Sequence, residues 1–167
     1  MKEMLKERFF RYAAVASQSK GGAGVVPTSE GQWQLARLLQ GELEELGLQD
    51  IQLSEFCVLT ARLPARLAEA RALPKVGFVA HLDTVDVHLS PEVKPQLVEK
   101  YDGSDICLNA EKQIFLRAAE HPELAQYIGQ DIITSDGTSV LGADNKAAIA
   151  AVMTDVYKRQ RWGSPFL

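Results

Sequence analysis

A histidine and two aspartates are the residues of this sequence best suited to chemistry. His81 and Asp83 stand two residues apart, directly after an apolar run, and Asp144 lies in the sequence GADNK ahead of a helix-forming stretch. Imidazole and carboxylate groups are common zinc ligands, and a carboxylate can bridge two cations through its two oxygens. The pattern therefore indicates His81 and Asp144 as metal ligands. Asp83 is assigned a supporting catalytic role, because it can accept the second imidazole N–H and so orient the ring.

Each of these residues also has a purely structural interpretation. A histidine that follows an apolar strand is commonly buried and bonded to the backbone, and an aspartate ahead of a helix is most simply its N-cap. The metal hypothesis therefore rests on the joint pattern and not on either residue alone. The other two histidines, His88 and His121, lie among prolines and charged residues typical of surface loops, and we expect neither to be functional.

The elements that must position these residues are a strand and a junction between a strand and a helix. Residues 76–81 are almost all small or apolar, which predicts a strand buried on both faces of a sheet. His81 and Asp83 then fall at its C-terminal end, where the loops of an open α/β sheet carry ligand sites. Residues 147–155 are predicted to be helical, so Asp144 is expected at a rigid helix start.

The remaining elements follow from hydrophobic periodicity and turn residues. Helical spacing predicts helices over 3–16 and 29–46, the second beginning with a capping box at Ser29. A D-G pair predicts a hairpin that joins residues 131–134 to 139–141. Further strands are predicted at 51–54, 58–63 and 96–99, and a connector containing a helical turn at 64–74.

The composition is that of an ordinary globular domain, with 167 residues of which 46% are hydrophobic and 24% charged. The net charge of -4 and the pI near 5.4 argue against nucleic-acid or anionic-membrane partners, which require a basic face. Cys57 and Cys107 lack the spacing of a zinc knuckle and are expected to be reduced thiols. Neither a signal peptide nor an apolar run of ~20 residues is seen, so we expect a cytoplasmic protein.

Three separate segments resemble one enzyme family. Residues 79–84 (VAHLDT), 132–137 (IITSDG) and 141–147 (LGADNKA) are similar, in this order, to segments of the peptidase T family. These enzymes are the tripeptide aminopeptidases among the di-zinc M20 metallopeptidases. The resemblance extends over residues 4–155, so it covers most of the chain.

The resemblance implies a role for each candidate site residue. His81 would bind one zinc ion, Asp144 would bridge both ions, and Asp83 would orient His81. The peptide bond between Asp144 and Asn145 would be cis. Asn145 stands where many family members have a second aspartate, and we do not expect it to be a ligand. The general base and the remaining metal ligands of the family have no counterpart in this sequence.

The fold implied by the resemblance is α/β, a twisted mixed sheet with helices on both faces. Residues 1–155 would form the N-terminal part of a zinc-peptidase catalytic domain, without its lid or dimerisation domain and its C-terminal part. Residues 156–167 do not resemble the family, and our hypothesis is that this tail is a sequence artefact. Strands without partners would leave apolar surface exposed, which predicts association.

The function implied by the resemblance is zinc-dependent release of the N-terminal residue of tripeptides by a metal-activated water. Short peptides are the expected partners and two zinc ions the expected cofactors, with no nucleic-acid or membrane partner. The sequence does not determine the oligomeric state, and the chain alone is predicted to be inactive. Two alternatives stay open: another M20 amidohydrolase, such as an N-acyl amino-acid deacylase or a dipeptidase, and a non-catalytic interaction module.

Overall fold

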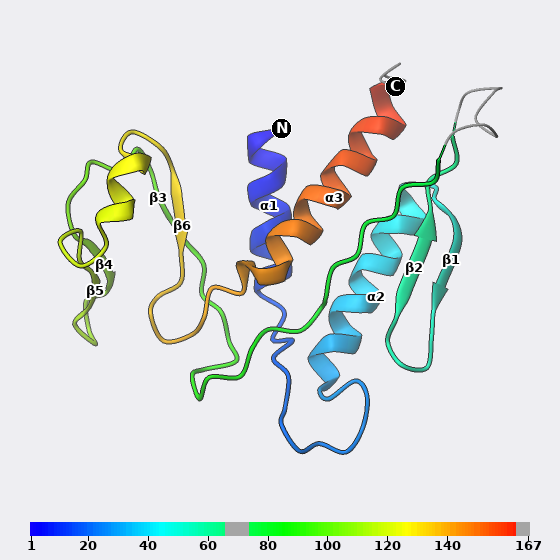
Figure 1. Cartoon of the computed structure of the whole chain (residues 1–167), viewed down its shortest axis with the longest axis horizontal. Helices are drawn as coiled ribbons and strands as arrows, with labels where there is room; N and C mark the ends of the chain where they lie inside the picture. Colours follow the sequence, from blue (N-terminus) through cyan, green and yellow to red (C-terminus); the bar gives the residue numbers. More distant parts are fainter. Residues whose placement is uncertain (66–73, 163–167) are drawn as a thin grey trace.

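The chain is a mixed α/β structure, seen in a computed structural model that describes residues 1–65 and 74–162 (Figure 1). The helical turn predicted in the connector 64–74 falls outside these residues. No helix in the described ranges is long and apolar enough to cross a bilayer. The elements in chain order are α1 (Lys2–Ala13), α2 (Glu30–Glu45), β1 (Gln49–Leu53), β2 (Leu59–Arg62), β3 (Gln96–Val98), β4 (Ile106–Asn109), β5 (Ile114–Leu116), the 3-10 helix η2 (Pro122–Tyr127), β6 (Ile132–Thr134) and α3 (Ala143–Trp162).

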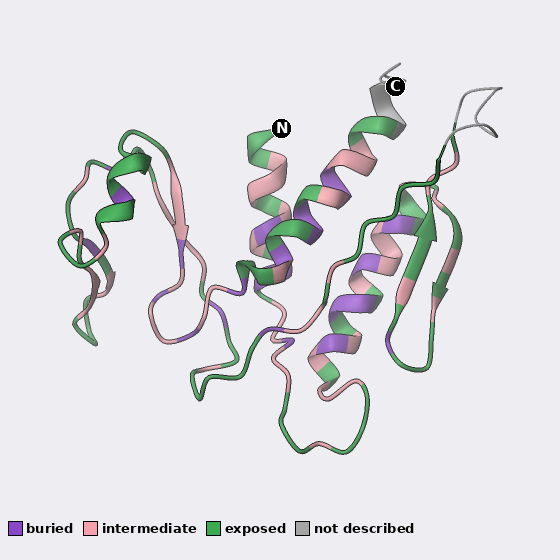
Figure 2. Cartoon of the chain, viewed as in Figure 1, coloured by how far each residue is buried: buried purple, intermediate pink, exposed green. Residues whose placement is uncertain are grey.

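Three helices build the main core. α1 and α3 run in opposite directions and pack against each other (Figure 1). Phe9 and Tyr12 of α1 are buried together with Leu35 and Leu39 of α2 and Met153 of α3, in one apolar cluster. The buried positions gather on the helix faces that look inward (Figure 2). The helices predicted over 3–16, 29–46 and 147–155 are therefore confirmed, because their apolar spacing matches the faces that they bury.

A polar network ties the first two helices together inside this core. The carboxylate of Glu42 in α2 accepts hydrogen bonds from Tyr12 Oη at 2.7 Å, from Arg11 Nη2 at 2.5 Å and from Arg8 Nε at 3.4 Å. Arg8 also reaches α3, since its Nη1 donates to Thr154 Oγ1 at 3.3 Å. Burial of Tyr12 and its bond to Glu42 hold the pKa of the phenol above its ordinary value. One partly buried carboxylate thus orders side chains of α1 against α2.

The strands of the described ranges form three separate two-stranded antiparallel sheets. β1 pairs with β2, β3 with β6, and β4 with β5. β1, β2 and β3 confirm the strands predicted at 51–54, 58–63 and 96–99. All three pairs are short, so the helices carry most of the buried apolar side chains.

The predicted hairpin between residues 131–134 and 139–141 is wrong. β6 pairs with β3 instead, with Leu97 opposite Ile133, and residues 139–141 form no strand. The loop between them is closed by side chains: Asp136 Oδ1 accepts from the Thr138 backbone N–H at 2.9 Å and from its hydroxyl. The D-G pair therefore marks a turn, as predicted, but the turn connects a strand to a loop.

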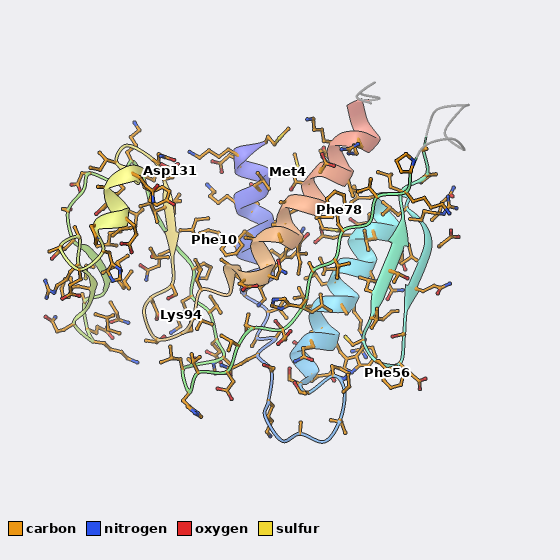
Figure 3. The ribbon with its side chains drawn as sticks, in the orientation of Figure 1. Met4, Phe10, Phe56, Phe78, Lys94 and Asp131 are labelled. Carbon is orange, nitrogen blue, oxygen red and sulfur yellow. The ribbon has the colours of Figure 1, made fainter. Side chains whose placement is uncertain are left out.

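The buried strand predicted over 76–81 does not form in this chain. Residues 74–83 are extended but lie in no sheet. Val76, Phe78 and Val79 are exposed by 75%, 71% and 98%, while Ala80 and Leu82 pack against the main core. Phe78 lies on the segment that passes between α3 and α2 in Figure 3. A strand needs a neighbour for its backbone hydrogen bonds, and no described strand lies alongside it.

The capping box predicted at Ser29 is also wrong. Ser29 makes no side-chain cap, and its hydroxyl is buried without a partner. The preceding residue takes the role: the Thr28 backbone N–H donates to Gln32 Oε1 at 3.2 Å, and Gln32 Nε2 donates back to Thr28 Oγ1 at 3.0 Å. The bond from the Thr28 N–H to the Gln32 side chain resembles one half of a capping box, but the Thr28 hydroxyl accepts from the side-chain amide of Gln32 and not from a helix N–H.

We predict that Glu42 contributes more to stability than an exposed glutamate of the same helix. Glu42→Gln removes the negative charge facing Arg8 and Arg11 and should lower the free energy of unfolding by about 2 kcal/mol. Tyr12→Phe removes one donor and should cost about 1 kcal/mol. Urea unfolding followed by circular dichroism measures both. Glu45→Gln at the exposed end of α2 is the matched control, expected within about 0.5 kcal/mol of the parent. Equal effects at Glu42 and Glu45 would contradict the network.

We predict that Asp136 gives the chain part of its acid sensitivity. The hydrogen bond from the Thr138 hydroxyl, followed by the backbone N–H, lowers the pKa of Asp136 below its ordinary value. A depressed folded-state pKa contributes stability that is fully present above the unfolded-state value near 4 and is lost as the pH falls through the folded-state value. The stability gap between parent and Asp136→Asn should therefore narrow below about pH 4. Thr138→Val should also narrow the stability difference between the chain with Asp136 and Asp136→Asn. If the stability of Asp136→Asn ran parallel to that of the parent over this pH range, the assignment would be refuted.

We predict that the extended segment 74–80 makes the chain associate at high concentration. It presents a run of exposed apolar side chains next to unpaired backbone, which is the combination that favours edge pairing between copies. Light scattering on a concentration series should show mass increasing with concentration, and Val79→Lys should reduce the effect. Val25→Lys, at an exposed valine in a loop outside this segment, is the control and should leave association unchanged.

Candidate metal centre

The two predicted metal ligands meet in space. His81 Nε2 lies 2.8 Å from Asp144 Oδ1, although 63 positions separate the two residues in the sequence. His81 belongs to the extended segment, and Asp144 belongs to the start of α3. The imidazole nitrogen and the carboxylate oxygen are therefore within hydrogen-bond distance of each other.

Asp83 holds the other side of the imidazole ring. His81 Nδ1 lies 2.9 Å from the Asp83 carbonyl oxygen and 3.2 Å from its carboxylate Oδ1. Partial burial lowers the pKa of His81, but the hydrogen bond to Asp144 and the contacts with Asp83 outweigh it, and the net shift is upward. Both ring nitrogens thus face oxygen atoms. Such an arrangement favours a cation at Nε2, either a proton or a metal ion.

The backbone at the start of α3 presents the Asp144 carboxylate to solvent. The Asp144–Asn145 peptide bond is cis, as the resemblance implied, and neither residue has helical φ and ψ angles. The Asp144 side chain is 92% exposed, so its second oxygen is open to a further ligand. Gly142 has a positive φ of 72°, and a Cβ there would lie 2.8 Å from Thr84 Cγ2. A glycine is therefore needed for the loop to pass Thr84 at this point.

Two buried polar residues beside the site were not singled out by sequence reasoning. Lys146 is fully buried, and its Nζ donates to the Val15 carbonyl at 2.7 Å. Burial lowers the pKa of Lys146 to about 8. Ser17 is also fully buried, and its hydroxyl donates to the Leu82 carbonyl at 2.7 Å. A helix-spacing pattern treats a lysine as a surface residue, so nothing in the sequence signalled its burial.

The remaining histidines make only local contacts in the part of the chain described. The His88 backbone N–H donates to Asp86 Oδ1, and His121 Nδ1 lies 3.0 Å from Glu123 Oε1. Across residues 1–65 and 74–162, no group of three or more His, Cys, Asp or Glu side chains is arranged to hold a metal ion. His81 and Asp144 thus supply two converging donors, fewer than the three or four protein ligands of a typical zinc site.

The donor chemistry of the pair fits zinc. A neutral imidazole and a carboxylate are both borderline ligands of the kind that Zn²⁺ accepts, and Asp83 occupies the outer position that usually fixes the tautomer of a ligating histidine. The exposed Asp144 carboxylate has a second oxygen for a second ion. The residues present are therefore of the types that a zinc site uses.

Comparison with known proteins supports the same family resemblance. No protein-family model matches the chain. It is 53% identical over 154 residues to a peptidase T-like protein of Yersinia pestis and 50% identical to one of Rhizobium meliloti. It is 46% identical to peptidase T of Geobacillus kaustophilus. The chain is similar to peptidase T. The matched region covers 92% of the chain but only 37% of each of these relatives.

The match to peptidase T confirms the resemblance drawn from the three segments at 79–84, 132–137 and 141–147. The chain spans a little more than a third of the length of the relatives that it matches. The activity and substrates of a protein of that full length are therefore a matter for proposal.

Proposed function

We propose that this chain is part of a zinc-dependent aminopeptidase that releases the N-terminal residue of tripeptides. The observation that carries the proposal is the 2.8 Å approach of His81 Nε2 to Asp144 Oδ1, at a point where the other imidazole nitrogen is held by Asp83. The names of the relatives, peptidase T and peptidase T-like protein, support a peptidase. Two free cysteines support a reducing compartment, and we propose the cytoplasm.

In this proposal each site residue has one task. His81 would hold zinc through Nε2, and Asp144 would hold it through its carboxylate. Asp83 accepts the Nδ1–H of His81, which keeps Nε2 free of its proton and aimed at Asp144. When bound, zinc polarises the scissile carbonyl and lowers the pKa of a coordinated water. The N-terminal peptide bond of a short peptide is the proposed substrate.

The remaining ligands and the general base are proposed to come from the rest of a protein with the length of the relatives. Two donors from the described residues do not complete a zinc site, and no third joins them. The same additional chain is proposed to supply strands that pair with residues 76–81, and so to build a twisted sheet with helices on both faces. The 167-residue chain by itself is therefore proposed to be inactive.

We predict that this chain can replace its counterpart in a working peptidase. A chimera would be made in which it substitutes for the matching 154 residues of Geobacillus kaustophilus peptidase T. It should cleave tripeptides, and a chelator should abolish the activity. His81→Ala and Asp144→Ala should each lower kcat/KM at least about a hundredfold, and Asp83→Asn by roughly ten- to a hundredfold, the range for partners that orient a ligand.

His121→Ala is the control variant. It removes a histidine whose imidazole contacts Glu123, and it should leave the activity of the chimera unchanged. Hydrolysis of N-acyl amino acids in place of tripeptides would instead identify another M20 amidohydrolase. A folded chimera that cleaves neither substrate class, beside an active parent, would identify a non-catalytic module.

A further inference from the structure

The segment that carries His81 is held in place by a short stretch at the end of α1. Thr84 N–H donates to the Ser17 carbonyl at 3.3 Å, and Ser19 N–H donates to the Thr84 carbonyl at 2.9 Å. Gln18 and Thr84 form an isolated parallel bridge. Among the described residues, no strand pairs with residues 74–83. The position of His81 therefore depends on its attachment to residues 17–19.

The Ser17 hydroxyl makes the attachment closest to the site. Its Oγ donates to the Leu82 carbonyl at 2.7 Å, and Leu82 lies between His81 and Asp83. Ser17 is fully buried, so its hydroxyl bonds this carbonyl away from bulk water. The bond fixes the peptide that joins the imidazole to the aspartate that orients it.

Lys146 connects the other half of the site to the same stretch. Its Nζ donates to the Val15 carbonyl at 2.7 Å, and it follows Asp144 by two residues. The lysine is fully buried, and this is the only hydrogen bond described for its ammonium group. The Ser17 N–H donates to the same Val15 carbonyl at 2.9 Å. Residues 15–19 therefore contact both segments that bring the candidate ligands together.

We propose that Ser17 is the positioning residue of the candidate metal centre, with Lys146 as its counterpart on α3. Ser17 sets the place of His81 through Leu82, and Lys146 sets the place of Asp144 relative to the same backbone. The effect of this positioning on zinc binding rests on the proposed function. The positioning itself is a property of the metal-free chain and is tested separately.

The first test reads the His81 ring in the 167-residue chain without metal. Nitrogen NMR at one fixed pH resolves the ring signals of the three histidines, which are assigned with His81→Ala, His88→Ala and His121→Ala. In Ser17→Ala the His81 ring signals should move toward those of a histidine in a short peptide, while the signals of His88 and His121 stay in place. Ser17→Thr, which restores a hydroxyl donor, should return the His81 signals toward those of the parent.

Ser19→Ala is the matched control. Its hydroxyl donates to the Thr84 carbonyl at 3.2 Å, but the Ser19 N–H already serves that carbonyl at 2.9 Å. The His81 signals should therefore be unchanged in this variant. If Ser17→Ala does not fold, Ser17→Cys keeps the volume with a weaker donor and should give a smaller shift in the same direction. Unchanged His81 signals in folded Ser17→Ala or Ser17→Cys, or equal shifts with Ser19→Ala, would overturn the proposal.

The second test measures Zn²⁺ binding by the chimera with Geobacillus kaustophilus peptidase T, as the parent and with the same substitutions, by competition with a chromophoric chelator. Ser17→Ala should weaken zinc binding about tenfold, the scale of losses seen when a partner that orients a ligand is removed, and Ser19→Ala should not. Parent-like zinc affinity in Ser17→Ala would count against positioning. No zinc uptake by the parent would count against the proposed metal function alone, because the NMR comparison would still decide the role of Ser17.

Discussion

The geometry of the site depends on the hydrogen bonds that residues 15–19 make with their surroundings. This stretch follows α1 and accepts or donates to the His81 segment through Ser17 and Ser19. It also receives the Lys146 ammonium from α3. α2 reaches it as well, since a Cβ at Gly31 would lie 1.8 Å from the Ala16 carbonyl oxygen. Three helices and the His81 segment thus meet at five residues of backbone.

The charges around His81 are a second constraint on the site. The imidazole of His81 stands between two aspartates, and neither has a lysine or arginine among its described contacts. The nearby ammonium of Lys146 is buried against a carbonyl and lies in no described ion pair. Protonation of His81 or a bound cation would offset the charge of the two carboxylates.

The small sheets leave large apolar side chains exposed at the surface. The helices bury a continuous apolar cluster, but the sheets have two strands each and the segment before His81 exposes three large apolar side chains. The comparison with peptidase T gives this a physical context, because the matched relatives are about two and a half times as long as this chain. A strand that is apolar on both faces requires neighbours on both edges, and the described residues provide none.

The sequence by itself determined what is local. Apolar spacing placed α1, α2 and α3, because a helix that buries one face must repeat its apolar residues every three to four positions. The motifs around His81 and Asp144 identified the residues that meet, and the cis bond before Asn145 followed from the resemblance. These features depend on residues close together in the chain or on a pattern specific to one family.

The tertiary structure alone decided what depends on distant partners. It paired β6 with β3 and not with residues 139–141, and it left residues 76–81 without a sheet. It also placed Ser17 and Lys146 beneath the site, where their spacing gave no sign of burial. Strand pairing and burial are set by contacts across long sequence separations. A single sequence records the residues that can make such contacts, but the partner that each one finds is settled only when the chain packs.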